Sequence, residues 1–243
     1  MKKIAKLINS VLKFFGLAIS KIDSAQPIEE ITKYEQALLD SVSQYTMTTT
    51  LRKWALIQSV KYVLANKIPG DFVESGVWRG GNLMIMKSLL KKNKCLTKKI
   101  YAFDTFEGMP QPHKKFDFKY DGTDANILYN RKKEWCYASI EDVSKNIQFD
   151  KNIKLIKGKV EQTLLLKKNI PKKIALLRLD TDFYNSTKIE LEELFPRLSK
   201  GGILIIDDYG AYTGCKKAVD NYFKKKFIFL HHVDHSCRLF IKP

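Results

Sequence analysis

Residues 47–243 predict an α/β fold with a mostly parallel, seven-stranded sheet, helices on both of its faces and a C-terminal antiparallel hairpin. Short apolar runs typical of buried strands alternate with segments of helical periodicity, which favours parallel strands joined by helices. Only a short polar stretch separates the last two runs, which indicates an antiparallel pair. The seven runs are residues 71–77, 99–106, 153–158, 173–180, 201–209, 227–233 and 237–243.

Helical periodicity fills the intervals between these runs. In one of these helices, Thr187 and Glu190 have the spacing of a capping box, which predicts a helix start at Thr187. Ahead of the strands, residues 24–46 are polar with scattered apolar positions and predict a helical linker. The clearest helical segments are residues 82–92, 141–148, 186–198 and 214–224.

The composition is ordinary for a globular chain that forms one large domain. Of its 243 residues, 44% are hydrophobic and 28% are charged, and no apolar stretch approaches the ~18 residues needed to span a membrane. The four cysteines show neither a CxxC pair nor zinc-ligand spacing, which predicts a reduced, cytoplasmic protein.

The chain carries a formal charge of +17, but only six of its 43 basic residues are arginine. Arginine is the residue that grips phosphate and guanine through two parallel hydrogen bonds. We therefore expect no nucleic-acid partner, although the charge keeps a nucleic-acid methyltransferase or binder open as an alternative.

Residues 1–23 predict a basic, amphipathic helical arm. Between residues 2 and 21 there are five lysines and no acid, and the apolar residues gather on one side of a helix, apart from Leu17. Three interpretations compete. Residues 1–22 can contact the anionic inner face of a membrane. The arm can instead pack or dimerise, or it can be an export signal, against which Lys13 interrupts the apolar run.

Acidic residues follow the predicted strands at one edge of the sheet. Ligands of such sheets bind at the carboxyl ends of the strands, and four of the five parallel strand ends carry acid in a chain of charge +17. This recurrence predicts the functional site at that edge. The residues there are Glu74-Ser75-Gly76, Asp104, Gly158, Asp180-Thr181-Asp182 and Asp207-Asp208.

The turn after the first strand has the pattern E-x-G-x-x-x-G, which differs from the G-x-G-x-x-G of pyrophosphate sites. Glu74 would repel a diphosphate but suits a cationic ligand, and Asp104 can accept hydrogen bonds from ribose hydroxyls. These features favour S-adenosylmethionine over NAD, with a glycine-rich turn in a non-catalytic domain as the alternative. The candidate cofactor contacts are Glu74, Ser75, Gly76, Gly80, Asp104 and Gly158.

The acids after the fourth and fifth strands predict a metal site. If these strands are neighbours, their carboxylates converge, and a divalent cation such as Mg²⁺ relieves the repulsion. We assign Asp180, Asp207 and Asp208 to the metal and Asp182 to the catalytic base. The metal would bind two adjacent substrate hydroxyls and acidify one, whose proton Asp182 takes. Helix capping by Asp182 and Asp208 is the competing interpretation.

Four segments resemble the TylF family of macrocin and novobiocin O-methyltransferases: GDFVESGVWRGGN, YAFDTFEGMP, LLRLDTDFYNST and LSKGGILIIDDYGAYTGCKKAVD. The resemblance covers residues 47–243. It implies a class I methyltransferase (Rossmann-like) fold, S-adenosylmethionine as donor, Mg²⁺ and a sugar hydroxyl as acceptor. The family's metal ligands fall on Asp180, Asp207 and Asp208 and its base on Asp182. Its cofactor contacts fall on Glu74 through Gly80 and around Asp104.

The chain also departs from the family pattern. Ser75 stands where cysteine is usual, and Phe183 stands where tryptophan is usual, which alters the acceptor pocket. Residues 111–136 depart most, and we interpret them as a lid or acceptor loop whose six basic residues contact an acidic or phosphorylated acceptor. An ordinary surface excursion is the alternative.

Two further expectations concern the termini and assembly. The histidines of residues 231–235 are expected at a strand end and hairpin rather than in a zinc site, because adjacent strand residues face opposite ways. The family's habit and the N-terminal arm favour a homodimer. The sequence does not indicate which sugar is the acceptor. A non-catalytic domain that serves as an interaction module is a further alternative.

Overall fold

The computed structural model describes residues 29–95, 97–132, 134–226 and 228–243. The chain divides into two units, residues 1–33 and residues 34–243. The predicted amphipathic arm lies outside the described residues, so its membrane contact and its role in dimerisation stay predictions. Among the helices that are described, none is long and apolar enough to cross a membrane.

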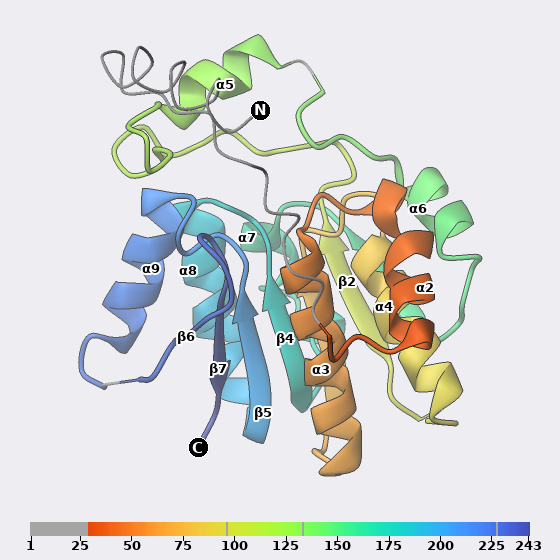
Figure 1. Cartoon of the computed structure of the whole chain (residues 1–243). Coiled ribbons are helices and arrows are strands. Elements are labelled where there is room, and N and C mark those ends of the chain that lie inside the picture. Colours follow the sequence, from red (N-terminus) through yellow and green to blue (C-terminus); the bar gives the residue numbers. More distant parts are fainter. Residues whose placement is uncertain (1–28, 96, 133, 227) are drawn as a thin grey trace, which may run out of the picture. The chain divides into compact units, whose positions relative to one another are not determined.

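A seven-stranded sheet forms the centre of the second unit, in the order β3-β2-β1-β4-β5-β7-β6 (Figure 1). The first five strands are parallel, and β7 pairs antiparallel with both β5 and β6. The predicted sheet and closing hairpin are therefore confirmed. The strands are β1 (Asp71–Ser75), β2 (Ile100–Asp104), β3 (Ile153–Lys157), β4 (Ile174–Leu179), β5 (Leu198–Ile206), β6 (His231–His232) and β7 (Arg238–Ile241).

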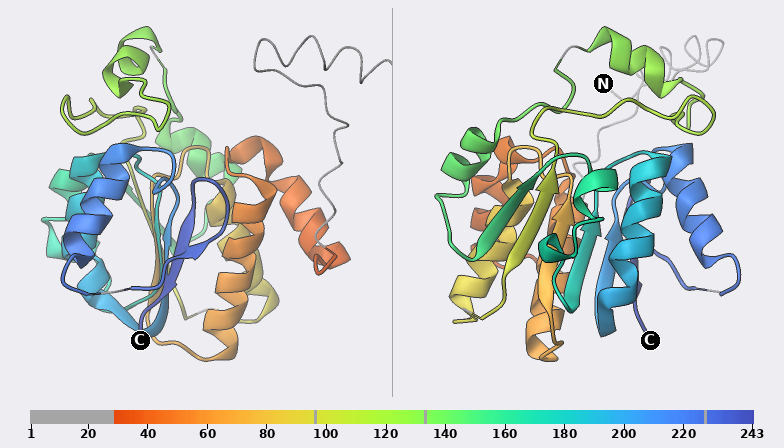
Figure 2. Two further views of the ribbon diagram at one scale, coloured as in Figure 1. Left: turned by 60° about the vertical axis from the view of Figure 1, so that its left-hand side comes forward. Right: turned by 180° about the vertical axis from the view of Figure 1, so that it is seen from behind.

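Helices cover both faces of the sheet. In Figure 2, α3 and α4 lie on one face, and α8 and α9 lie on the other. The α-helices are α2 (Lys33–Ser41), α3 (Thr50–Ala65), α4 (Gly81–Lys92), α5 (Ala125–Arg131), α6 (Ile140–Asn146), α7 (Val160–Thr163), α8 (Tyr184–Glu193) and α9 (Thr213–Phe223). Short 3-10 helices occupy Ser43–Tyr45, Lys167–Asn169 and Phe195–Arg197.

The burial of each strand follows its place in the sheet. All six residues of the central strand β4 are buried, whereas β3, at the edge, has buried, half-buried and exposed positions. A strand covered by helices on both faces needs a continuous apolar sequence, and an edge strand does not. The single charged residue inside β4, Arg178, is therefore held by partners described below.

Several boundaries differ from the expected ones. The helix expected over 186–198 is α8 followed by a 3-10 turn, and α8 begins at Tyr184, ahead of the predicted start. Thr187 and Glu190 are both buried inside this helix, so the capping box is wrong. Glu190 instead accepts a hydrogen bond from the Thr181 hydroxyl at 3.0 Å. The first hairpin strand is also shorter than expected.

The carboxyl ends of the five parallel strands meet at one edge of the sheet. In Figures 1 and 2, α5 and the loops on either side of it lie beyond this edge. Much of the segment expected as a lid, residues 111–136, therefore lies over the strand ends. Its division from the rest of the domain, and its role as a lid, stay predictions.

Candidate active site

A cavity of about 290 Å³ opens at the carboxyl ends of the strands. One part of its wall is the glycine-containing turn after β1, and another part is the group of aspartates after β4 and β5. The predicted residues on the wall are Gly76, Asp104, Gly158, Asp180, Asp182, Asp207 and Asp208. The structure thus brings the two groups of strand-end residues together around one space.

Gly76 lets the turn after β1 approach the end of β4. Its φ of 78° lies in the left-handed region, and a Cβ at this position would overlap the carbonyl oxygen of Asp180. A residue larger than glycine would therefore push the donor-side turn and the acidic strand end apart.

Asp104 organises the same turn. Its Oδ2 accepts the backbone N–H groups of Val77 and Trp78 at 2.7 and 3.1 Å, and its Oδ1 accepts that of Phe106 at 2.8 Å. Burial raises the pKa of Asp104, although these hydrogen bonds act in the opposite direction and favour the charged carboxylate. The residue therefore shapes the turn as well as lining the cavity, a second role that the strand-end pattern did not indicate.

Three predicted cofactor contacts are not on the cavity wall. Glu74 is buried and its Oε1 accepts from Nη1 of Arg178 at 2.7 Å, and burial raises its pKa to about 7. Ser75 is fully buried, and its hydroxyl has no hydrogen-bond partner among the described residues. Gly80 directly precedes α4 as its N-cap residue and faces the side chains of Ile147 and Val143. These residues support the wall from behind.

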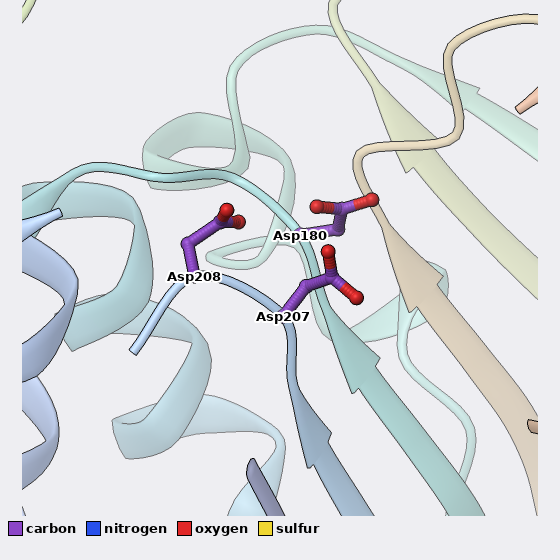
Figure 3. Close-up of side chains that lie close together, drawn as sticks. All are labelled: Asp180, Asp207 and Asp208. Carbon is purple, nitrogen blue, oxygen red and sulfur yellow. The ribbon is translucent and has the colours of Figure 1, made fainter. Parts of the chain in front are cut away.

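The acids after β4 and β5 converge as predicted (Figure 3). The strands are neighbours, with Leu179 in register with Ile206, so Asp180 and Asp207 leave the sheet at the same level. Ligand atoms of Asp180, Asp207 and Asp208 lie within 4.8 Å of one another. In the described part of the chain, this is the one group of acids, histidines and cysteines suited to a metal, which leaves the histidines of residues 231–235 outside any such group.

Arg178 neutralises part of this charge from inside β4. Its Nη1 donates to Asp180 and to Glu74, and its Nη2 donates to Asp207, each at 2.7 Å. Burial opposes its charge, but the surrounding carboxylates raise the pKa of the guanidinium above its usual value. Sequence reasoning missed Arg178, although an arginine within an apolar strand needs acidic partners and shares a face with the residue two positions on.

Arg52 of α3 is the second arginine that was missed. Its Nη1 donates to Oδ2 of Asp207 at 2.7 Å, and its Nε donates to Oδ2 of Asp234 at 2.8 Å. Asp207 is 155 residues away and Asp234 is 182 residues away in the chain, so no local pattern signals the contact. Both oxygens of Asp207 therefore have a guanidinium partner.

The acidic group still fits a divalent cation. Oδ2 of Asp208 is buried and accepts no hydrogen bond from a donor among the described residues. Burial, together with the neighbouring carboxylates of Asp182, Asp180 and Asp207, raises the pKa of this carboxyl well above its usual range. Each carboxylate oxygen has two lone pairs, so those of Asp180 and Asp207 that bind arginine can also ligate an ion. Hard oxygen ligands of this kind suit Mg²⁺.

Asp182 lies in the same cavity on a strained turn. Its φ is 62°, a left-handed conformation that is uncommon for residues other than glycine, although aspartate and asparagine adopt it more often than most. Burial raises the pKa of this carboxyl above its usual value, and neighbouring Asp180 and Asp207 add to the rise. The N-cap residues directly before α8 and α9 are Phe183 and Tyr212, and neither side chain caps its helix. Helix capping therefore does not explain Asp182 or Asp208.

Aromatic residues form the other side of the cavity. Trp135 and Tyr212 line it, and both rings pack edge-on against Phe183, with centroid distances of 6.0 and 5.7 Å. Phe183 itself is buried behind them. The departure from the family at Phe183 therefore affects the cavity through the two rings that it supports.

Comparisons with known proteins identify the family of this chain. The profile of the Macrocin-O-methyltransferase (TylF) family matches residues 19–242. The chain belongs to the TylF family. It is therefore an O-methyltransferase, and the fold of this family takes S-adenosylmethionine as methyl donor.

Individual relatives of the family are similar over most of their length. Demethyldecarbamoylnovobiocin O-methyltransferase of Streptomyces niveus is 34% identical over 188 residues, which are 74% of this chain and 68% of the relative. A rhamnosyl-tetracenomycin-C 4'-O-methyltransferase of Streptomyces olivaceus is 34% identical over 183 residues, 73% of this chain and 67% of the relative. The solved structure of the O-methyltransferase NovP aligns with a TM-score of 0.74 at 31% identity, over 82% of both chains.

Proposed function

We propose that this TylF-family protein methylates a sugar hydroxyl and that it depends on a divalent cation held by Asp180, Asp207 and Asp208. The convergence of these three carboxylates beside the Gly76 turn carries the proposal, because it places an acidic cation site and a donor turn on one cavity. A relative that acts on a rhamnosyl-tetracenomycin supports a sugar acceptor.

The chain's own residues supply positioning and proton transfer. The Gly76 turn and Asp104 would hold the donor, and Trp135 and Tyr212 would offer flat surfaces to the acceptor. A bound Mg²⁺ would supply Lewis acidity to two adjacent hydroxyls of the sugar. Asp182 would take the proton of the reacting hydroxyl while its oxygen forms a bond to the methyl carbon and the carbon–sulfur bond breaks. S-adenosylhomocysteine leaves with the electron pair of that bond.

A methyl-transfer assay tests both parts of the proposal. We expect the protein to transfer labelled methyl groups from S-adenosylmethionine to at least one member of a panel of sugars and glycosides that carry adjacent hydroxyls. EDTA should abolish this turnover, and added Mg²⁺ should restore it, because the three carboxylates hold the cation that activates the hydroxyl.

The control is the binding of S-adenosylhomocysteine, which EDTA should leave intact because the Gly76 turn and Asp104 do not belong to the proposed cation site. Turnover that persists in EDTA would refute the cation requirement. Methylation of nucleic acid in place of every sugar would refute the acceptor class.

A further inference from the structure

One fully buried carboxylate lies outside the proposed cation site. Asp117 belongs to the segment over the strand ends, and none of its surface is exposed to solvent. Its Oδ2 accepts the backbone N–H of His113 at 2.6 Å, and its Oδ1 accepts the backbone N–H of Tyr184 at 2.8 Å. One side chain thus joins the loop to the first residue of α8.

Asp117 also lies against the start of α9. A Cβ on Gly214 would overlap Oδ1 of Asp117 and would approach the backbone nitrogen of Tyr184 to 2.9 Å. The first turns of both helices therefore pack around this carboxylate. Glycine is required at residue 214, because the side chain of any other residue would displace Asp117.

A short backbone seam continues the contact towards the cavity. The Thr213 hydroxyl donates to the carbonyl of Phe116 at 2.6 Å, and the Thr213 N–H donates to the carbonyl of Phe118 at 2.9 Å. Lys119 then forms an isolated bridge with Tyr212, whose ring lines the cavity. The loop and the cavity wall are thus one connected structure.

Aromatic rings of the residues that Asp117 joins also pack against one another. The His113 ring stacks on Phe116 at 4.4 Å, and Phe116 contacts the Tyr184 ring at 4.6 Å. The residue after Asp182 is Phe183, and Tyr184 follows it. The N–H that Asp117 accepts from α8 is therefore two residues from the proposed base.

We propose that Asp117 is a positioning residue for the acceptor. By fixing the loop to the starts of α8 and α9, it sets the positions of Tyr212 and of the Asp182 turn relative to each other. A carboxylate suits this place, because it accepts two backbone N–H groups at once and carries a negative charge near the start of α8. The inference rests on the proposed function in one respect, namely that the acceptor is a sugar.

Graded substitutions test the proposal. Asp117→Asn keeps one acceptor oxygen and Asp117→Ala keeps none, so both should raise the acceptor KM, the second by about tenfold or more. Gly214→Ala should act in the same direction by displacing the carboxylate. The binding of S-adenosylhomocysteine, measured by calorimetry, should be unchanged, because the proposed donor site at the Gly76 turn does not include Asp117 or its partners His113, Tyr184 and Gly214.

The same loop offers a matched control. Asp121 is exposed, pairs with Lys119 and accepts a hydrogen bond from the N–H of Thr123. Asp121→Asn therefore removes one negative charge from the loop and leaves the contacts of Asp117 with His113 and Tyr184 in place. Its acceptor KM should equal that of the wild type. An unchanged KM in Asp117→Ala, or an equal loss of donor and acceptor binding, would overturn the proposal.

Limited proteolysis separates this inference from the proposed function. Cleavage within residues 111–136 should be faster in Asp117→Ala than in Asp121→Asn, with no acceptor present. If the wild type methylates no sugar but this difference is found, the acceptor class is wrong and the anchoring by Asp117 is supported. Equal cleavage of the two variants would overturn the anchoring.

Discussion

Asp182→Asn is expected to lower kcat by about two to four orders of magnitude, because it removes the group that takes the proton of the reacting hydroxyl. The backbone should tolerate the change, since asparagine is among the few residues that adopt the left-handed conformation seen at Asp182. Steady-state kinetics with a sugar that the wild type methylates, together with calorimetric binding of S-adenosylhomocysteine, would measure the effect.

Asp220→Asn is the control for this substitution. Asp220 lies on α9, is 45% exposed and pairs with Lys216, so its loss should leave kcat unchanged. Asp182→Asn should retain donor affinity, and excess Mg²⁺ should not restore its turnover. A variant that keeps kcat within about tenfold of the wild type would show that another group removes the proton.

Arg178→Met should lower the free energy of unfolding by about 3–5 kcal/mol. Methionine fills a comparable volume, but Glu74, Asp180 and Asp207 would lose the guanidinium that each contacts at 2.7 Å. Uncompensated carboxylates in a buried place cost far more than the packing that methionine supplies. Urea denaturation followed by circular dichroism would measure the change.

Arg131→Met provides the comparison, because Arg131 is an exposed arginine at the end of α5 and its loss should cost less than about 1 kcal/mol. If Arg178→Met lowered the free energy of unfolding by as little as Arg131→Met, the account of the acidic group would be contradicted. Such a result would mean that Glu74, Asp180 and Asp207 do not need the buried arginine.

The positions of the acids were predictable because of an elementary property of parallel sheets. Strand ends that carry Asp180 and Asp207 point to one edge, and an apolar run such as that of β4 identifies a central strand. The mostly parallel sheet followed from the alternation of apolar runs and helices, and the closing hairpin followed from the short polar stretch between the last two runs, whereas the order of the strands came from the structure alone. Boundaries were less accurate where a turn such as that at Asp182 begins a helix early.

The partners of the acids were not predictable because they come from distant parts of the chain. Arg52 reaches Asp207 across 155 residues, and Asp117 reaches Tyr184 across 67 residues. No periodicity connects such pairs, and only the packed structure shows them. Thr187 and Glu190 gave a misleading local signal, since the spacing of a capping box also arises inside a buried helix.

Calorimetric titration of the protein with Mg²⁺, in the presence of S-adenosylhomocysteine, tests the central claim most directly. We expect one ion to bind per chain in the wild type, and its affinity should fall by at least about tenfold in Asp208→Asn, which replaces one carboxylate oxygen and the negative charge by an amide NH2 group. Equal affinity in the two proteins, or no binding to the wild type, would contradict a cation held by these three aspartates.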